Sequence, residues 1–534
     1  MRHGIKASLA AAVAALFALG VPAGAQSLGQ PVYESIDRWE ALGYIDRLYV
    51  LRPYSPEELS RILEAVIAAG TPADAAEAQA FMADLGSGGL SLAARHVSGA
   101  SAGTGGARYA GISSAGLSVA ANPADSLWLS GGVDLALQDG RQAVLPYGRR
   151  GDFELNDDPS MNFLPAGLSG DAMGLLYALS SNVWFGSASL WGSASYARSS
   201  AGPFWNNGIF IGPQASAAPN WTLHASFGPW RYSSALFQLV PKGPGSYAHE
   251  KYLAFHSYSF SPAAGLDLGV LETVVWAGTF KPLYLVPLSM LFYMQSLAGT
   301  GYGDNSLAGV YASWRAAPGL VLKASAYFDD VGMNDILKLR FDTKIIGAVQ
   351  GGLAWAPPAG YLRLVSLDYT AVFPYMYAHH TDYDSTQDNY THFGDSFGAA
   401  LQPNSDRLEL RVRLRPAERL KAEAFLGLFR HGNASEGING GDGSWFDDGW
   451  IGETPSYQPP FESATVPRYF RFLSQDVIET VAQLGASLSW TPALERSLLS
   501  VECSYTFEYS WNRDLVAGAR GCSNYLGLTL SWRL

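Results

Sequence analysis

Two tryptophans and two aspartates lie close together near residue 450 and have the chemistry of a ligand site. Trp445, Asp447, Asp448 and Trp450 fall within residues 441–461, a stretch rich in glycine and proline. Aromatic rings can stack on the apolar faces of sugars, and carboxylates accept hydrogen bonds from hydroxyl groups. We favour a simpler interpretation, in which these aromatics pack the loop or lie at a membrane interface, because their spacing matches no diagnostic motif.

Alternating charges offer a second kind of chemistry. In residues 407–415 charged and apolar residues alternate, and residues 338–344 repeat the pattern. Such a basic strip can guide an anionic polymer or solute. We favour a polar lumen in which the basic residues pair across strands with Glu409, Glu423 and Asp342. The basic candidates for lining the lumen are Lys338, Arg340, Arg407, Arg411, Arg413 and Lys421.

Metal and catalytic chemistry have less support. His379, His380, Asp382 and Asp384, with His392 nearby, are of metal-ligand types, but their spacing matches no recognised ligand pattern. A catalytic histidine needs an activated nucleophile, and the sequence identifies none. We therefore expect no enzyme activity, no metal and no cofactor.

Composition limits the elements that can carry these residues. The chain has 534 residues, of which 48% are hydrophobic and 15% charged, and no run after residue 25 is long enough for a membrane helix. This excludes a helical transporter, and the net charge of -12 argues against a nucleic-acid binder. Residues 1–25 join Arg2 and Lys6 to an apolar run and a small-residue cleavage site, which is typical of a secretory signal peptide.

Three helices are expected in residues 26–87. Apolar residues recur at near-helical spacing in residues 32–48. Ser55 and Glu58 form a capping box before a second helix, and Thr71 begins a third in a similar way. The pattern predicts a small helical bundle ahead of the strands.

From residue 88 the apolar period changes to two, which indicates β-strands. Soluble strands average about 5 to 6 residues, whereas stretches such as 499–511 reach the roughly 9 to 11 residues that cross a bilayer with tilt. The apolar parity is expected to face lipid and the charged parity the lumen. Tryptophans near strand ends fit interfacial girdles, namely Trp314, Trp355, Trp490 and Trp511.

Turn signals provide a strand count. Eight short turns are expected near residues 121, 180, 217, 261, 316, 357, 415 and 491. Long connections are expected near 139–171, 229–250, 277–306, 371–405 and 431–479. With a first strand near 88–100 and a closing strand at 522–534, the count is about eighteen. The predicted fold is an all-β transmembrane barrel of antiparallel strands over residues 88–534. We also expect the apolar segment 277–306 to fold inward as a constriction.

Cys503 and Cys522 are the two cysteines of the chain. They share the parity expected to face lipid and flank the last loop, so a disulfide across neighbouring strands is geometrically allowed. The sequence favours neither the disulfide nor two free thiols.

One set of segments covers much of the chain, namely residues 252–278, 282–295, 303–314 and 326–330, together with WEALGYID, RPYSPEEL and residues 392–406. These segments resemble the Wzi-like capsule-assembly family. The matching positions with most weight are His256, Glu272, Tyr284, Pro287, Gln295, Asp304, Asn305, Asp329 and Asp330. We expect the polar ones to order the barrel interior and its mouth through buried hydrogen bonds.

The resemblance implies an outer-membrane barrel of eighteen strands with a periplasmic helical bundle and long extracellular loops. It implies a lectin-like role in capsule assembly or in attaching capsular or surface polysaccharide, and it brings no catalytic motif. The alternative is a porin or a selective solute channel, because a barrel of this size can enclose an aqueous lumen. The expected partners are outer-membrane lipid, the polysaccharide and the barrel-insertion machinery, but no nucleic acid. We expect a monomer.

Overall fold

Three helices precede the barrel strands. The computed structural model describes residues 31–86, 89–124, 126–139, 145–148, 173–187, 189–204, 207–241, 250–297, 304–331, 338, 345–378, 388–432, 472–492 and 498–533. The helices are α2 (Pro31–Leu42), α3 (Pro56–Ala69) and α4 (Pro72–Gly86). Residues 1–25, where the signal peptide is predicted, lie outside the described residues. No helix in the described ranges is long and apolar enough to cross a membrane.

The predicted helix starts are confirmed by their caps. The Ser55 hydroxyl accepts a hydrogen bond from the Glu58 N–H at 3.1 Å, which caps α3. The Thr71 hydroxyl accepts from the Asp74 N–H at 3.2 Å at the start of α4. Both residues satisfy an amide that the first turn of a helix leaves unpaired.

The predicted helix over residues 32–48 is too long at its C-terminal end. Gly43 has a left-handed φ of 79°. Its N–H and that of the next residue bond to carbonyls in the last turn of α2, which is the pattern of a Schellman motif. The glycine therefore ends α2 at Leu42, although apolar residues continue beyond it.

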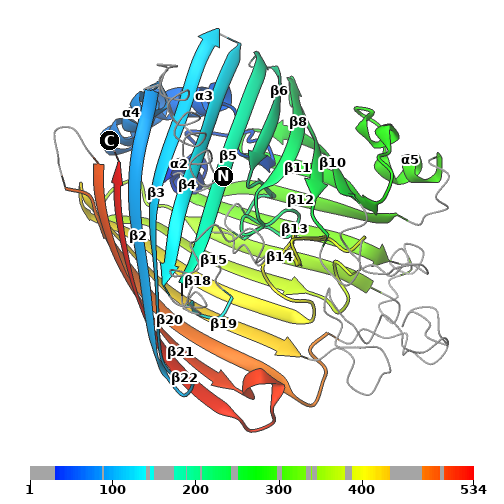
Figure 1. Ribbon diagram of the computed structural model, residues 1–534. Coiled ribbons are helices and arrows are strands. Elements are labelled where there is room, and N and C mark those ends of the chain that lie inside the picture. Colours follow the sequence, from blue (N-terminus) through cyan, green and yellow to red (C-terminus); the bar gives the residue numbers. More distant parts are fainter. Residues whose placement is uncertain are drawn as a thin grey trace, which may run out of the picture.

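Most of the remaining described chain is β-strand (Figure 1). The barrel strands are β2 (Gly89–Gly103), β3 (Gly106–Ala124), β4 (Leu127–Asp139), β5 (Met173–Ser187), β6 (Leu190–Ala197), β8 (Ala218–Phe227), β9 (Trp230–Leu239), β10 (Lys251–Ala263), β11 (Leu266–Ala277), β12 (Asn305–Ala317), β13 (Leu320–Val331), β14 (Ile345–Trp355), β15 (Leu362–Val372), β18 (Ser405–Ala417), β19 (Leu420–Gly432), β20 (Ile478–Trp490), β21 (Leu498–Trp511) and β22 (Arg520–Arg533). Two small sheets are separate from the barrel sheet, formed by β1 (Leu51–Arg52) with β7 (Ser200–Ala201) and by β16 (Thr391–His392) with β17 (Asp395–Ser396). The short helices are α5 (Leu291–Leu297), η3 (Pro282–Leu285) and η4 (Arg513–Leu515).

The eighteen barrel strands form one closed sheet, which confirms the predicted fold class. Consecutive barrel strands pair antiparallel, and β2 closes the barrel by pairing with β22. In that closing pair Ala93 lies opposite Arg533 and Gly103 lies opposite Ser523. Closure gives every barrel strand two neighbouring strands.

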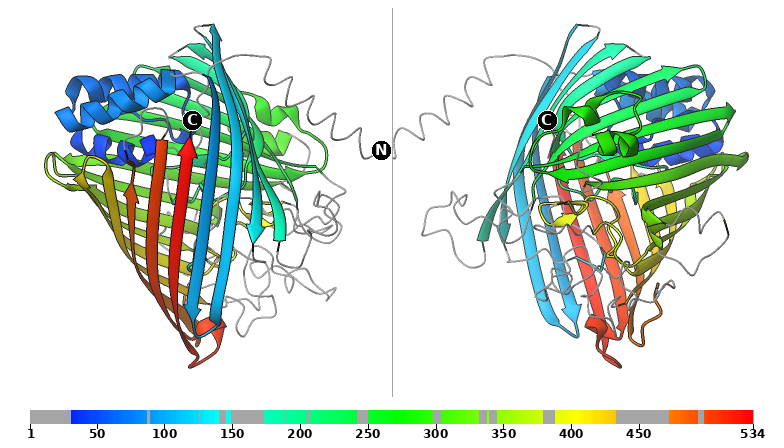
Figure 2. Two further views of the ribbon diagram at one scale, coloured as in Figure 1. Left: turned by 60° about the vertical axis from the view of Figure 1, so that its left-hand side comes forward. Right: turned by 90° about the vertical axis from the view of Figure 1, so that its right-hand side faces the viewer.

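The two ends of the barrel differ in the length of their connections. All eight connections at the end where β22 finishes are short, and we call this the short-turn end. Most connections at the opposite end are long, and we call this the long-connection end. Figure 2 shows α2, α3 and α4 at the same end as the C-terminus, which is the short-turn end.

Two predicted turns are wrong, although the number of turns is right. Residue 180 lies within β5, and Pro219, in the turn expected near 217, lies within β8. The chain instead reverses after Ser187 and at Gly228, whose φ is 60°. Gly228 stands before a proline, and this Gly-Pro pair is itself a turn signal. The long connection expected at 229–250 therefore contains strand β9.

The exposed outer face of the barrel is apolar, as the strand parity predicts. On β18 the side chains of Leu408 and Leu410 are exposed, whereas Arg407 and Glu409 are buried on the inner face. Exposed tryptophans lie near strand ends, including the four predicted positions, Trp314, Trp355, Trp490 and Trp511. An apolar band with aromatic borders is the surface that a transmembrane barrel presents to lipid.

Candidate functional site: a filled barrel lumen

The helices enter the lumen at the short-turn end. Lys323 projects inward from β13, and its ammonium group lies 2.8 Å from a carboxylate oxygen of Asp37 and 2.9 Å from one of Glu40. Both acids belong to α2. The Ser313 hydroxyl of β12 also donates to Glu40, at 2.7 Å. These bonds fix α2 against the inner wall of the barrel.

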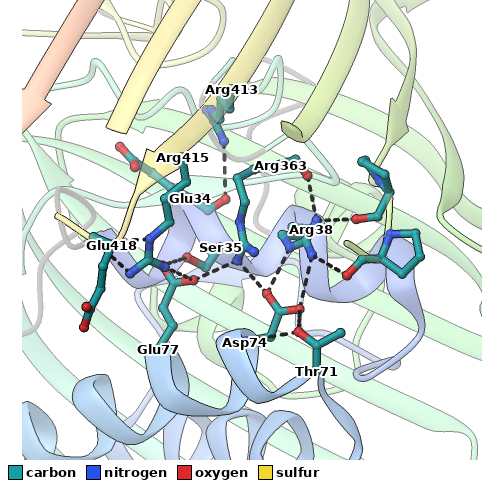
Figure 3. Close-up of polar contacts among 12 residues, drawn as sticks. Glu34, Ser35, Arg38, Thr71, Asp74, Glu77, Arg363, Arg413, Arg415 and Glu418 are labelled. Atoms are coloured by element: carbon teal, nitrogen blue, oxygen red, sulfur yellow. Dashed lines mark hydrogen bonds and ion pairs between the residues drawn. The ribbon is translucent and has the colours of Figure 1, made fainter. Parts of the chain in front are cut away.

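A charged network joins two helices to the β14–β15 turn (Figure 3). Arg38 on α2 donates two hydrogen bonds to the carboxylate of Asp74 on α4, at 3.0 and 3.2 Å. It also donates to the Pro357 carbonyl of the turn at 2.8 Å. Arg363, on β15, approaches Asp74 at 2.5 Å and Glu77 at 3.0 Å. The two guanidinium groups thus hold α4 and the barrel together.

Asp74 is buried, but its partners keep it charged. Burial acts to raise the pKa of the carboxyl group, whereas hydrogen bonds from Arg38 and Thr71 and the charge of Arg363 lower it. The net result is a pKa below the usual value. Asp74 is therefore an ionised link in this network at neutral pH.

Inward-folded segments occupy the lumen from the long-connection end. Three described segments contribute buried apolar side chains that pack against the inner wall in one cluster, namely residues 199–217 without 205 and 206, residues 373–378 and residues 388–404. Tyr327, fully buried on β13, lies at their meeting point. The ring centroids of three aromatics from these segments surround it, at 5.1 Å for Phe210, 6.0 Å for Tyr390 and 6.3 Å for Tyr377.

Hydrogen bonds tie the inward segments to one another. The Tyr377 hydroxyl donates to the Ile209 carbonyl at 2.6 Å, and the Tyr390 hydroxyl donates to the Phe210 carbonyl at 2.8 Å. Each buried hydroxyl thus satisfies a backbone group that strand pairing does not reach. We call the three inward segments the plug. Its aromatic residues were not among the functional candidates predicted from the sequence.

His392, considered as a metal ligand in the sequence analysis, serves as a structural residue of the plug. Its Nδ1 accepts a hydrogen bond from the Val240 N–H at 2.9 Å, and its Nε2 lies 3.0 Å from the Ala217 carbonyl. These partners assign the neutral ring with its proton on Nε2. In the part of the chain that the structure describes, no group of three or more His, Cys, Asp or Glu residues is placed to hold a metal. His379, His380, Asp382 and Asp384 lie outside that part.

Acidification is expected to loosen the plug through His392. Burial lowers the pKa of the ring from 6.5 to about 4, so the unfolded segment binds a proton at a higher pH than the folded one. The stability that depends on a neutral ring is complete above pH 6.5 and is lost as the pH falls to about 4, by about 3 kcal/mol in total. Hydrogen-exchange protection of residues 388–401, measured between pH 7 and pH 4, should fall accordingly.

The His392→Gln variant is the control for this prediction. Asp388, on the same segment, titrates with the opposite sign, because burial raises the pKa of its carboxyl group to about 6. The stability that its protonated carboxyl group contributes to the folded segment is lost as the pH rises from about 4 to 6. The contribution of the imidazole ring is therefore the difference in the pH dependence of exchange protection between the wild type and His392→Gln. An equal pH dependence in both proteins would contradict the role of the ring.

The predicted pairing of lumen charges with Glu409 and Glu423 is observed for Arg411 and Arg413. Arg411 lies 2.5 Å from Glu409 and also bonds to Glu423, while Arg413 lies 2.9 Å from Glu423. Lys421 shares their inward parity on β19, through the pairing of its strand with β18. The basic residues are thus interleaved with acids and do not form a continuous basic strip.

Arg407 differs from its neighbours on β18. It is buried, and its guanidinium carbon lies 5.9 Å from the centroid of the Phe429 ring. Its Nε and Nη2 atoms find no hydrogen-bond partner among the described residues. Lys338 is exposed and lies in the connection between β13 and β14, so it is not on the inner face of a barrel strand. Arg340 and Asp342 lie outside the described residues.

Five of the family-like positions meet on the outer wall of the barrel instead of in its interior. Residues 280–297, which include η3 and α5 and which we call the strap, lie against the outer faces of β9, β10 and β11. The inward constriction predicted for this segment is therefore wrong, and Figure 1 shows α5 outside the barrel. The five residues are His256, Glu272, Tyr284, Gln295 and Asp304, and all take part in holding the strap.

Pro287 also lies in the strap, and the last three family-like positions lie on β12 and β13. The Asn305 side chain donates to the Asp388 carbonyl of the plug at 3.0 Å, which agrees with an interior ordering role. Asp329 lies at a register shift between β13 and β14, and its charge raises the pKa of Tyr377, after the larger effect of burial. The Asp330 side chain lies outside the described residues.

The candidate sugar-binding loop lies outside the described residues, with Trp445, Asp447, Asp448 and Trp450. The two cysteines are described and are free. Cys503 lies opposite Leu528 on β22, six residues from Cys522. This offset separates the two by roughly 20 Å along the strand, so the disulfide allowed by the sequence does not form.

The fold and the lumen define a class before any comparison. The protein is a closed eighteen-stranded barrel of the transmembrane kind, with N-terminal helices inserted at one end and inward segments packed at the other. No protein-family model matches the sequence, and no curated protein matches it.

Solved structures provide the particular likeness. The chain is similar to Wzi of Escherichia coli, described as an outer-membrane protein involved in group 1 capsule assembly and a carbohydrate-binding β-barrel. The two share 14% identity over 96% of this chain and 99% of that one, with a TM-score of 0.57. OprD of Pseudomonas aeruginosa has 10% identity, coverage of 83% and 94%, and a TM-score of 0.41. OccAB2 of Acinetobacter baumannii has 8% identity, coverage of 83% and 98%, and a TM-score of 0.45. At this identity, the likeness to Wzi establishes a shared fold.

Proposed function

We propose that this protein is a non-enzymatic outer-membrane protein that binds capsular or surface polysaccharide and helps to assemble or attach it. The observation that carries the proposal is the plug. Protein side chains occupy the lumen along the inner wall around Tyr327, where a solute channel needs open space. The fold shared with Wzi, a carbohydrate-binding barrel involved in capsule assembly, supports the same assignment.

The proposed orientation follows from the two ends of the barrel. Long loops are extracellular and short turns are periplasmic in outer-membrane barrels. With that orientation the helices face the periplasm and the long-connection end meets the polysaccharide. Trp445, Asp447, Asp448 and Trp450 belong to the connection between β19 and β20 at this end and remain the sequence-based candidates for sugar contact.

Planar-bilayer conductance and polysaccharide binding, measured on the same purified protein, test the proposal. We expect low conductance and saturable binding of polysaccharide extracted from the source cells. The double variant Trp445→Ala/Trp450→Ala should weaken binding, whereas Trp490→Ala, at the short-turn end, should not. A large, stable conductance that polysaccharide does not change would overturn the proposal in favour of a solute channel.

A further inference from the structure

The strap covers ionisable side chains that point away from the barrel. His256 and Glu272 are register partners on β10 and β11, and their nearest polar atoms lie 4.0 Å apart. On β11, Leu268 and Val270 share the parity of Glu272 and are exposed on the outer face. Glu272 therefore points outward as they do. It is nevertheless only 15% exposed, and His256 is 2% exposed.

These two residues lie at a height where the surroundings of the barrel are apolar. Leu266, at the start of β11, pairs with Trp314 of the short-turn girdle, and Glu272 lies six residues further along the strand. Six residues of a strand tilted by about 40° rise roughly 15 Å, and the apolar band of such barrels is roughly 25 Å tall. Glu272 and His256 thus stand within the band, where an uncovered ionisable group is unfavourable.

The covered side chains satisfy the backbone of the strap. Glu272 accepts hydrogen bonds from the Leu291 and Phe292 N–H groups, at 2.7 and 3.3 Å. His256 Nδ1 and the Tyr258 hydroxyl both lie 3.0 Å from the Ser289 carbonyl. Irregular backbone is tolerated at membrane depth only where protein satisfies its polar groups. The outward polar side chains and the strap backbone therefore compensate for each other.

Further bonds anchor the two ends of the strap beside β12. The ammonium group of Lys281 lies 2.6 Å from the Asp304 carboxylate, and the Tyr284 hydroxyl donates to the same carboxylate at 2.6 Å. Near the other end of the strap, Gln295 donates to the Asp304 carbonyl and accepts from the Ser306 hydroxyl. The segment is thus held along its length against the wall.

The outer surface of the strap is apolar. Residues 282–297 contain no Asp, Glu, Lys or Arg. Large apolar side chains point away from the barrel along this stretch, each between 42% and 67% exposed: Leu285, Val286, Leu288, Met290, Phe292, Tyr293 and Leu297. This surface continues the lipid-facing band formed by Leu268, Val270 and Val310 on the neighbouring strands.

We propose that the strap lies within the hydrocarbon layer and that its exposed side chains contact lipid acyl chains. Over the part of β9, β10 and β11 that the strap covers, the protein surface that meets the membrane is then made by residues 282–297 and not by the barrel strands. The inference does not depend on polysaccharide binding, because it uses only the outer wall.

Spin-label accessibility in phosphatidylcholine liposomes tests this proposal. Single nitroxide labels are placed at Met290→Cys and Phe292→Cys, in a background in which Cys503 and Cys522 are replaced by serine. The reference for lipid contact is Val310→Cys, and the reference for water is Asp514→Cys, whose side chain is 81% exposed at the long-connection end. We expect both strap labels to favour collision with oxygen over a water-soluble nickel chelate by the same ratio as the Val310 label.

Two results would overturn the proposal. Collision ratios like that of the Asp514 label would place the strap in water. Low collision with both reagents would show that protein covers the strap, and a change on dilution would then identify a second copy of the chain. Because Met290 and Phe292 are exposed, labelling them leaves the packed underside of the strap intact.

Discussion

Replacing Asp74 with alanine is expected to release α4 from the barrel and to destabilise the docked helices by roughly 3 to 5 kcal/mol. The carboxylate is fully buried and accepts hydrogen bonds from Arg38, Arg363 and Thr71. Without it, Arg38 keeps its charge in a buried position with only carbonyl partners among the described residues. Hydrogen exchange of residues 31–86 in detergent micelles measures the loss as faster exchange.

Asp84→Ala is the matched control, because Asp84 is also an α4 carboxylate paired with a barrel arginine. Its partner is Arg533 at the end of β22, and the two side chains are 46% and 45% exposed. Solvent already screens this pair, so the cost should stay below about 1 kcal/mol. Equal losses in the two variants would contradict the argument that burial makes Asp74 the stronger link.

Strand parity could be predicted where the two faces of a strand meet different surroundings. On β18 Arg411 and Arg413 pair with acids on the inner face of the same strand and of β19, while Leu408 and Leu410 face outward. The alternation of charged and apolar residues therefore predicts which side chains face the lumen and which face outward. The same reasoning predicted the fold class, the closing strand and the tryptophan borders, all of which depend on local pattern alone.

Parity gives no guide where both faces of a strand are covered. From Lys251 to Ser257 every residue of β10 is buried, because the plug packs on the inner face and the strap on the outer face. From the sequence alone, His256 and Glu272 are therefore interpreted as lumen residues, although both point outward. For the same reason the apolar strap is interpreted as a constriction inside the barrel. The error has a physical cause, since the sequence pattern does not reveal which segment covers which face.

The plug could not be predicted for a related reason. Tyr327 meets Phe210, Tyr377 and Tyr390 only because barrel closure brings two connections, β6–β8 and β15–β18, to one point of the inner wall. The spacing of residues within one segment does not predict these contacts between segments. The run FPYMY at residues 373–377 was the available signal, because its aromatics follow no strand alternation.

Replacing Tyr327 with alanine is expected to open the plug. The ring is fully buried and touches aromatics from all the inward segments, so its removal leaves a cavity that three separate segments border. Truncations of large buried aromatics cost about 3 to 5 kcal/mol. The cost falls on the packing of the plug, because β13 keeps its backbone pairing with β12 and β14. Faster exchange of residues 388–404 and a higher planar-bilayer conductance than the wild type should accompany it.

Tyr327→Phe separates the ring from its hydroxyl group. The hydroxyl lies 2.5 Å from the Thr273 hydroxyl and also hydrogen-bonds with Tyr390, so its loss removes these polar contacts, worth about 1 kcal/mol each, and keeps every ring contact. Conductance should then stay at the wild-type level, since the lumen remains filled. A conductance increase in Tyr327→Phe as large as in Tyr327→Ala would assign the anchoring to the hydrogen bonds instead of the ring. Unchanged exchange in Tyr327→Ala would mean that the inward segments hold one another without the wall, through the Tyr377 and Tyr390 hydroxyls.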